Sequence, residues 1–252
     1  DPGTGYKKLY VQAGNVRNRG VEMTLGFNKK FGAFDYNTSL TATANRNKII
    51  KLASGVTNPI SGQVFDLTDI RKGRFRLREG GELGDVYASE RIKRDANGYV
   101  EYTQGQSLVT EPTEPYKIGS VNAKWNFGWK HGFSYKGFDL NVLFTARLGG
   151  IVISKTQAAL DKFGVSQASA DARDAGGVTL GQGLNIDPQK YYDAVYNLDS
   201  YYVYSATNVR LQELSLSYSL PNSVFGKVFK NVGLSVYATN LWMIYNKAPF
   251  DP

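Results

Sequence analysis

The sequence contains no cysteine and only one histidine, His131, in 252 residues. Without thiols it can form no disulfide, no cysteine-based zinc site and no cysteine nucleophile. A single histidine leaves the common zinc sites and serine–histidine catalysis without the residues that they need. A pair of carboxylates of the glycosidase type stays open, but no stretch points to one. We therefore expect no enzyme activity, no catalytic residue, no metal site and no cofactor. We expect His131 to be a polar residue near one rim of the fold, beside a short turn.

Long hydrophobic runs are also absent. The mean hydropathy is −0.35, and no run approaches the ~18–20 apolar residues of a transmembrane helix. This excludes a helical membrane protein but leaves open a β-barrel, whose strands each give a weaker signal. Residues 1–5 have the composition of a loop rather than of a signal peptide, so we expect the mature protein to begin upstream.

Basic and aromatic residues are plentiful. The net charge is +8, and the chain holds 17 tyrosines. A basic balance suits a nucleic acid, an anionic membrane surface or an acidic substrate, but it also results from cations spread over wet surfaces, which we favour. Residues 71–78 form a basic run, RKGRFRLR. It is compatible with an anion contact, such as a lipopolysaccharide phosphate, or with a solvated strand, and we favour the strand.

The clearest structural signal lies between Tyr116 and Gly149. It predicts two long antiparallel strands, Ile118–Ser134 and Phe138–Leu148, joined by a tight turn at 135–137. Apolar and polar side chains alternate along both strands, with Leu143 as an apolar exception on the polar face. Both reach the ~9–11 residues with which a tilted strand crosses a bilayer. The pattern predicts the wall of an outer-membrane β-barrel, with one face toward lipid and the other toward a wet lumen.

The alternation assigns individual side chains to the two faces. Five are predicted to face lipid: Trp125, Phe127, Leu140, Val142 and Phe144. Five are predicted to face the lumen: Asn122, Lys124, Asn126, Asn141 and Thr145. The residues that bind substrate stay unknown at this stage.

Similar patterns predict further strands over Gly20–Phe31, Phe34–Asn47, Val86–Lys93, Tyr99–Thr103, Tyr201–Leu220 and Val232–Ile244. The pair 86–93 and 99–103 forms a short hairpin around the turn Asp95-Ala96-Asn97-Gly98. In 201–220 the apolar face switches sides near Gln212–Glu213, which predicts a β-bulge there. We therefore predict an all-β fold, an antiparallel transmembrane β-barrel segment of about eight strands.

The connections between strands alternate in length. Short turns at 32–33, 95–98, 135–137 and 221–231 contrast with longer connections at 51–85, 104–117 and 150–200. Outer-membrane barrels have short periplasmic turns and long extracellular loops. We therefore expect 51–85 and 150–200 to lie outside the cell. Within the second loop, Thr156–Phe163 and Gln167–Asp174 have helical spacing.

Several motifs resemble those of SusC/RagA-type TonB-dependent outer-membrane transporters of Bacteroidetes. They are Asn18–Glu22 (NRGVE), Tyr135–Leu140 (YKGFDL), Val209–Pro221 (VRLQELSLSYSLP), Val236–Leu241 (VYATNL) with Asp251-Pro252, and Thr156–Ala158 with Ala168–Gly177 (ASADARDAGG). Each motif is modest alone, but together they follow the family's order from residue 18 to the end.

The resemblance implies more than the pattern does. Family members are several times longer and have a roughly 22-stranded barrel, an N-terminal plug and a TonB box. Residues 1–252 would then be a C-terminal part of such a barrel, with the plug, the TonB box and the final strands absent. The resemblance implies import of an oligosaccharide or a peptide beneath a SusD-like surface lipoprotein, energised through TonB, in the outer membrane of a Gram-negative cell. The implied partners are that lipoprotein, TonB and membrane lipid, with no nucleic acid.

Two other classes of protein compete with this interpretation. A soluble β-sandwich that binds glycans through its tyrosines requires the apolar faces to meet in one core. A nucleic-acid-binding protein requires basic residues clustered with aromatics on one module, which the sequence does not show.

Overall fold

The structure, a computed structural model, describes residues 12, 14–58, 61–103, 108–180, 184–221 and 232–252. Its largest element is an open, twisted six-stranded sheet, the wall, in the order β1-β2-β9-β10-β15-β16. The strands are β1 (Gly14–Phe31), β2 (Phe34–Leu52), β9 (Trp125–Tyr135), β10 (Phe138–Leu148), β15 (Asn208–Ser219) and β16 (Gly233–Asn246). Neighbouring strands are antiparallel throughout.

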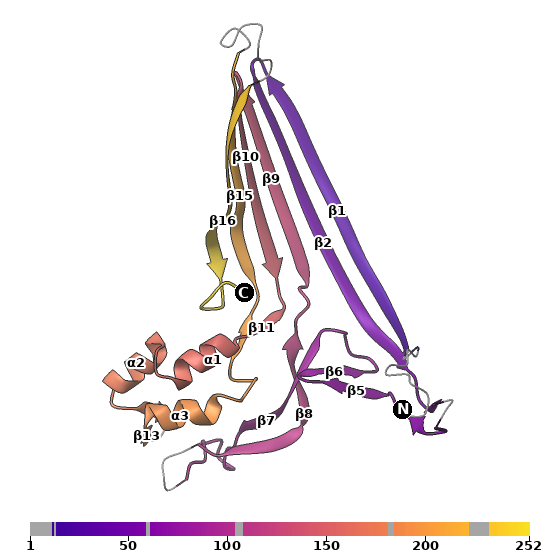
Figure 1. The fold of residues 1–252 in the computed structure, drawn as a ribbon, viewed down its shortest axis with the longest axis vertical. Helices are drawn as coiled ribbons and strands as arrows, with labels where there is room; N and C mark the ends of the chain where they lie inside the picture. The colour runs from indigo at the N-terminus through magenta and orange to yellow at the C-terminus, as the bar shows by residue number, and fades with distance from the viewer. Residues whose placement is uncertain (1–11, 13, 59–60, 104–107, 181–183, 222–231) are drawn as a thin grey trace.

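The long connections gather at one end of the wall, as Figure 1 shows, and form what we call the loop-end unit, residues 53–124 and 149–207. It contains the pairs β3 (Val56–Thr57) with β4 (Val64–Phe65), β11 (Ile151–Ile153) with β14 (Val203–Ser205), and β12 (Val178–Leu180) with β13 (Leu184–Ile186). A four-stranded sheet joins β5 (Asp69–Lys72), β6 (Phe75–Arg78), β7 (Asp85–Ile92) and β8 (Thr110–Ser120). The helices are α1 (Lys155–Lys162), α2 (Gln167–Asp174) and α3 (Pro188–Val195).

The tight turns of the two predicted hairpins lie at the opposite end from the loop-end unit (Figure 1). Gly32 and Gly137 adopt φ angles of 62° and 88°, which favour glycine. The predicted turn at 221–231 lies almost wholly outside the described residues. The turn at 95–98, which the sequence grouped with these short turns, belongs instead to the loop-end unit.

Two predicted strands are wrong in extent. The stretch predicted as one strand, 118–134, is divided between β8 and β9, which belong to different sheets. Val121 donates its backbone N–H to Gly84, whereas Lys124 donates to Leu148 of the wall. Likewise β7 pairs with β8 rather than with 99–103, although the Asp95 turn survives through a bridge between Arg94 and Val100. The wall therefore has six strands where about eight were expected.

The predicted bulge is confirmed. The register between β10 and β15 shifts between Leu143 and Phe144, so that Leu143 lies opposite Glu213 and Phe144 opposite Leu211. Gln212 is the extra residue. Because the bulge adds one residue to β15, Leu211 and Leu214 lie on the same face although they are three positions apart in the sequence.

Among the residues that the structure describes, the cluster of buried hydrophobic side chains lies in the loop-end unit. Its buried cluster is Leu108, Ala158, Ile186, Tyr191, Tyr192, Val195, Leu198 and Tyr202. The helices α1 and α2 confirm the two predicted helices within one residue. Helix α3 was not predicted from the sequence. It begins with a side-chain cap: Asp187 accepts hydrogen bonds from the backbone N–H groups of Gln189 and Lys190 at 3.0 and 3.2 Å. No helix in the described ranges is long and apolar enough to cross a membrane.

Candidate functional site

The wall has one apolar face that continues across all six strands. Residues that lie opposite one another in antiparallel strands share a face, and the register therefore aligns the apolar positions. The apolar face carries Val21, Met23, Leu25, Phe27, Leu40, Ala42, Phe127, Trp129, Phe133, Leu140, Val142, Phe144, Ala146, Leu211, Leu214, Leu216, Val236 and Ala238. Many of them are uncovered, since Val21, Leu234 and Val236 are 60%, 69% and 73% exposed.

Polar groups on this apolar face are paired with one another. The hydroxyl of Tyr36 lies 2.9 Å from Nδ1 of His131, and Trp129 donates its indole N–H to the hydroxyl of Thr38 at 3.1 Å. His131 lies within β9, a few residues before the turn at 135–137, and on the apolar face between Trp129 and Phe133. Such pairing is what an apolar surrounding demands, because an unsatisfied polar group there costs several kcal/mol, or roughly 2–7 on common scales.

The opposite face of the wall is mainly polar, with Leu143 of β10 as an apolar exception. On β2 it carries Asp35, Asn37, Ser39, Thr41, Thr43 and Asn45, and on β10 Asp139, Asn141, Thr145 and Arg147. Two glycines of β9 leave room for polar neighbours, because a Cβ atom at Gly128 or Gly132 would lie within 3 Å of the side chain of Thr41 or Asn37. The predicted split of β9 and β10 into two faces is therefore present in the register. That the apolar face contacts lipid stays a prediction.

A polar cleft of about 600 Å³ lies where this face meets the loop-end unit. We call it the rim cleft. It forms because β2 and β9 stop pairing after Thr43 and Asn126, while β2 continues to Leu52. Its lining residues are Asn45, Arg46, Glu82, Lys117, Ser120, Asn122, Ala123, Lys124, Gly149, Gly150 and Ile151. Asn122 and Lys124, predicted as lumen-facing strand residues, thus precede β9 and line this cleft.

Hydrogen bonds and an ion pair hold the lining of the rim cleft. Asp85 is 2% exposed, and its carboxylate lies 2.6 Å from the ammonium of Lys117. Ser120 donates its hydroxyl proton to Glu82 at 3.1 Å. Nδ2 of Asn122 is buried beside Gly84 without a hydrogen-bond partner in the described structure. The cleft therefore combines fixed charges with one unused donor. No sequence signal could have found it, because it joins segments 45–46, 117–124 and 149–151.

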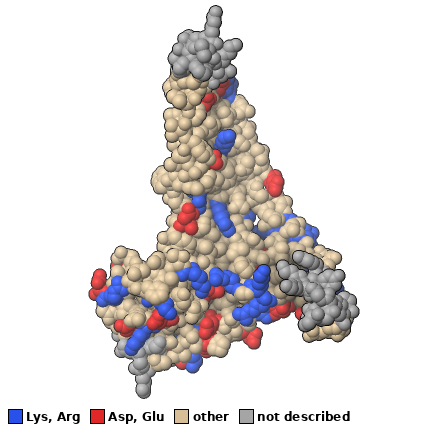
Figure 2. Space-filling view, viewed as in Figure 1, with Lys and Arg blue, Asp and Glu red and all other residues tan. Residues whose placement is uncertain are grey.

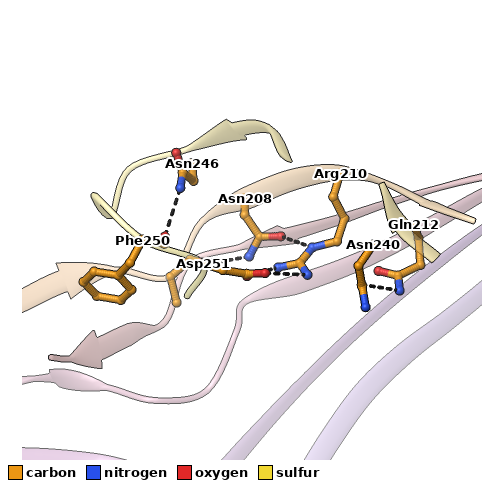
Figure 3. A network of polar contacts seen from close by, with 8 residues as sticks. Asn208, Arg210, Gln212, Asn240, Asn246, Phe250 and Asp251 are labelled. Atoms are coloured by element: carbon orange, nitrogen blue, oxygen red, sulfur yellow. Dashed lines mark hydrogen bonds and ion pairs between the residues drawn. The ribbon is translucent and has the colours of Figure 1, made fainter. Parts of the chain in front are cut away.

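The two motifs nearest the C-terminus meet in one network (Figure 3). Asp251 accepts a hydrogen bond from the Arg210 guanidinium at 2.6 Å, and Arg210 also donates to Asn208 at 3.4 Å. Asn246 donates to the carbonyl oxygen of Phe250 at 3.0 Å, which turns the last residues back toward β15. The network thus ties residues 247–252 to the loop end of the wall.

The basic run 71–78 is partly neutralised within the loop-end unit, where Arg74, Arg76 and Arg78 are paired with carboxylates. Asp69 contacts Arg76 and Arg78, and the hydrogen bond from Arg76 is the main reason why the pKa of Asp69 is lowered. Asp199 pairs with Arg74 at 3.6 Å and with Lys155 at 2.8 Å. These pairs support the interpretation as a solvated strand rather than a free anion site. Figure 2 shows that charged side chains of both signs crowd the loop-end unit, whereas the far part of the wall carries few.

Known proteins resemble this chain in sequence and in fold. The chain is 26% identical to "TonB-dependent receptor P3" from Formosa agariphila over 99% of its own length and 26% of that protein. Its fold matches the RagAB peptide transporter with a TM-score of 0.61 and 20% identity, over 95% of this chain and 26% of the other. The "open-open" state of the RagAB peptide importer matches with a TM-score of 0.58, again at 20% identity and over 94% and 26% of the two chains. No protein-family model matches.

These matches confirm the predicted resemblance and the predicted fold class, an antiparallel β-barrel wall segment. The matched proteins are named as a receptor and as transporters, which agrees with the predicted class of protein. The chain spans about a quarter of the length of each protein that it matches.

Proposed function

We propose that this chain forms part of an outer-membrane TonB-dependent transporter that imports oligosaccharides or peptides. The observation that carries the proposal is the continuous apolar face of the wall, which is in register across six strands and has a mainly polar face behind it. Along β10 that face runs from Phe138 to Leu148. Ten residue steps span about 33 Å, which at a tilt near 40° covers roughly the 25 Å apolar band of such barrels.

The soluble alternatives lack support in the structure. A β-sandwich would bury the apolar face against a second sheet, but in the described part of the chain that face stays exposed and the core cluster lies in the loop-end unit. A nucleic-acid-binding module would leave its basic residues free for phosphates, whereas the basic run 71–78 is largely engaged by Asp69 and Asp199.

Cysteine labelling tests the orientation of the wall. Single cysteines replace Phe127 and Val142 on one face and Asn126 and Asn141 on the other, in the protein inserted in its membrane. We expect a lipid-soluble maleimide to label the first pair and a water-soluble maleimide the second. The reverse pattern would mean that the face with Asn126 and Asn141 contacts lipid. Labelling of all four positions by the water-soluble reagent would overturn membrane insertion.

The rim cleft is the substrate contact that the geometry favours. It opens at the loop end of the polar face, and it offers amide, ammonium and carboxylate groups to a polar substrate. One relative's structure is described as a peptide transporter, but the lining chemistry also suits the hydroxyl groups of an oligosaccharide. The substitution Asn122→Ala should weaken substrate binding and leave the amount of inserted protein unchanged, whereas Asn37→Ala, on the polar face farther from the cleft, should have no effect. Equal binding by both variants would move the substrate elsewhere.

The loop-end unit is the proposed contact for a SusD-like lipoprotein, and we assign the connections 51–85 and 150–200 to the extracellular side. Support comes from their common position at one end of the wall (Figure 1) and from the pairing of a transporter with a second protein that the name RagAB implies for that relative. Energisation by TonB and the placement of residues 1–252 in the C-terminal part of a larger barrel belong to the same proposal.

Deleting residues 155–185 should leave the wall inserted but weaken co-purification of the lipoprotein. If the lipoprotein is retained at full strength, this contact is wrong.

A further inference from the structure

Four basic residues share the apolar side of the wall just beyond its apolar band. They are Arg17 and Arg19 on β1 and Arg46 and Lys48 on β2, and we call them the basic quartet. Arg46 lies at the rim of the wall and also borders the rim cleft. Val21 lies opposite Ala44 on the apolar face. One two-residue step farther, Arg19 lies opposite Arg46, and one more step places Arg17 opposite Lys48. Because the register shifts only beyond Val16, all four side chains leave the sheet on the same side as Val21.

The level of the quartet along the strand matches a membrane surface. Strands β1 and β2 have 18 and 19 residues, whereas β9 and β10 have 11 each. On β1 the apolar positions run from Phe31 to Val21, which again spans about 33 Å, or roughly 25 Å along the membrane normal at a tilt near 40°. The extra length of β1 and β2 therefore carries the quartet out of the apolar band and into the layer of lipid headgroups.

The quartet has no counter-charge on its own side. Side chains that lie directly opposite have Cβ atoms about 5 Å apart, and like charges there are destabilising. In the described structure no carboxylate lies within 4 Å of any of the four, and all four are exposed. The other side of this extension is covered: Ile49 is 0% exposed and exchanges backbone hydrogen bonds with Gly80 and Gly81. The nearby carboxylate of Glu79 is used on that covered side, where it accepts from the backbone of Leu52 at 2.9 Å.

We propose that the basic quartet binds the phosphate groups of a phosphorylated glycolipid in the outer leaflet. Phosphate suits the quartet because guanidinium groups bind it with two parallel hydrogen bonds, and one phosphate between opposed cations removes their repulsion. Continuity with the apolar band favours a lipid over a soluble anion, since the acyl chains of the same molecule then cover Val21 and Met23. The inference rests on the proposed insertion of the wall in a membrane.

The test uses the intact membrane protein that contains this chain, reconstituted in phosphatidylcholine vesicles. The vesicles contain either monophosphoryl lipid A or its dephosphorylated form, and bound lipid is counted by native mass spectrometry. We compare the wild type with R17Q/R19Q/R46Q/K48Q. Neutralising the quartet should weaken retention of the phosphorylated lipid by at least about tenfold, because each cation near a charged membrane surface contributes on the order of 1 kcal/mol. Retention of the dephosphorylated lipid should stay weak for both proteins.

Two control variants separate the site from its net charge. R71Q/K72Q/R94Q/R173Q removes four exposed cations of the loop-end unit and should retain the lipid as the wild type does. R19K/R46K keeps the charge but loses the two-pronged geometry, so it should retain the lipid better than the glutamine variant. All variants should insert equally, since the quartet is exposed and contributes no described side-chain contact.

The outcomes distinguish this inference from the proposed function. If the wild type fails to insert in vesicles, the membrane assignment falls and the inference falls with it. If it inserts but retains both lipids equally, or if the quartet and control variants lose the lipid to the same extent, only the lipid site is wrong. Displacement of the phosphorylated lipid by millimolar inorganic phosphate would show a free-anion site and would also overturn it.

Discussion

In the wall, Leu234 and Val236 are 69% and 73% exposed, whereas in the loop-end unit Val195 and Tyr202 are fully buried. Both regions belong to one chain and have similar apolar residues, but they place them differently. The loop-end unit buries its apolar residues against one another, as a water-soluble domain does. The wall displays them on one continuous face, which is stable only when something apolar covers it. The comparison shows that the two regions are built for different solvents.

The largest expected effect comes from emptying the core of the loop-end unit. Tyr202→Ala removes a side chain that is 0% exposed and leaves a cavity among Tyr192, Val195 and Leu198. We expect a loss of roughly 3–5 kcal/mol in the local stability of α1–α3, measured by hydrogen exchange in the intact protein. Phe163→Ala is the matched control, because that ring is 72% exposed. Similar losses for both would mean that the unit has no distinct core.

A charge on the apolar face of the wall ranks next. Val142→Arg should lower the stability of the inserted protein by roughly 2–4 kcal/mol, because the charge then lies within the bilayer. Asn141→Arg, one residue away on the polar face, should cost much less. Urea unfolding in lipid vesicles measures both. A larger cost at Asn141 would mean that the face with Asn141 contacts lipid and the face with Val142 contacts water.

Alkaline pH should act on one region and spare the other. Burial and the nearby Asp161 carboxylate raise the pKa of Tyr202 well above its usual value of 10.0, and burial also raises the pKa of Tyr201. In the unfolded chain both tyrosines ionise near pH 10. The folded unit keeps them neutral, so its stability is complete below pH 10 and falls as the pH rises above it.

Absorbance at 295 nm measures this ionisation, and hydrogen exchange above pH 10 locates the loss of structure. Opening should begin in α1–α3. If the amides of the wall begin to exchange first, the ionisation of Tyr201 and Tyr202 does not control the alkaline stability of the loop-end unit.

Removing the cap of α3 should have a smaller effect. Asp187→Ala deletes the carboxylate that accepts from the first backbone N–H groups of the helix. We expect a loss of about 1 kcal/mol, confined to α3, and detected as faster exchange of its amides. Gln189→Ala, in the same turn, serves as the control, and an equal effect there would mean that the cap contributes nothing.

The smallest effect should come from the C-terminal network. Asp251 is 64% exposed at its side chain, so its pair with Arg210 is only partly shielded from water. Asp251→Asn should cost between about 0.2 and 1 kcal/mol and less in high salt. Proteolysis of residues 247–252 measures how firmly they are held. A loss larger than that of the α3 cap would assign this pair a structural role in closing the end of β16.

Much of the wall was predictable because its pattern is local. Alternation with a period of two identifies a strand and its two faces without knowledge of its partners. The turn at Gly137, the bulge at Gln212 and the helices near Thr156 and Gln167 follow equally from short stretches of sequence. Asp187 followed by Pro188 is also a typical start of a helix that can be recognised in the sequence, although α3 was not predicted.

The remainder depends on contacts between distant segments. Alternation continues without a break from Ser120 through Trp125, so it cannot show that the chain leaves one sheet and enters another at 121–124. The rim cleft, the pairing of Arg210 with Asp251, and the place of His131 beside Tyr36 each join residues that are far apart in the sequence. The sequence by itself thus determined which face of each strand is apolar, because that depends on neighbours two residues away. Only the tertiary structure decided which strands of different hairpins lie side by side, because backbone hydrogen bonds between strands carry no record of side-chain identity.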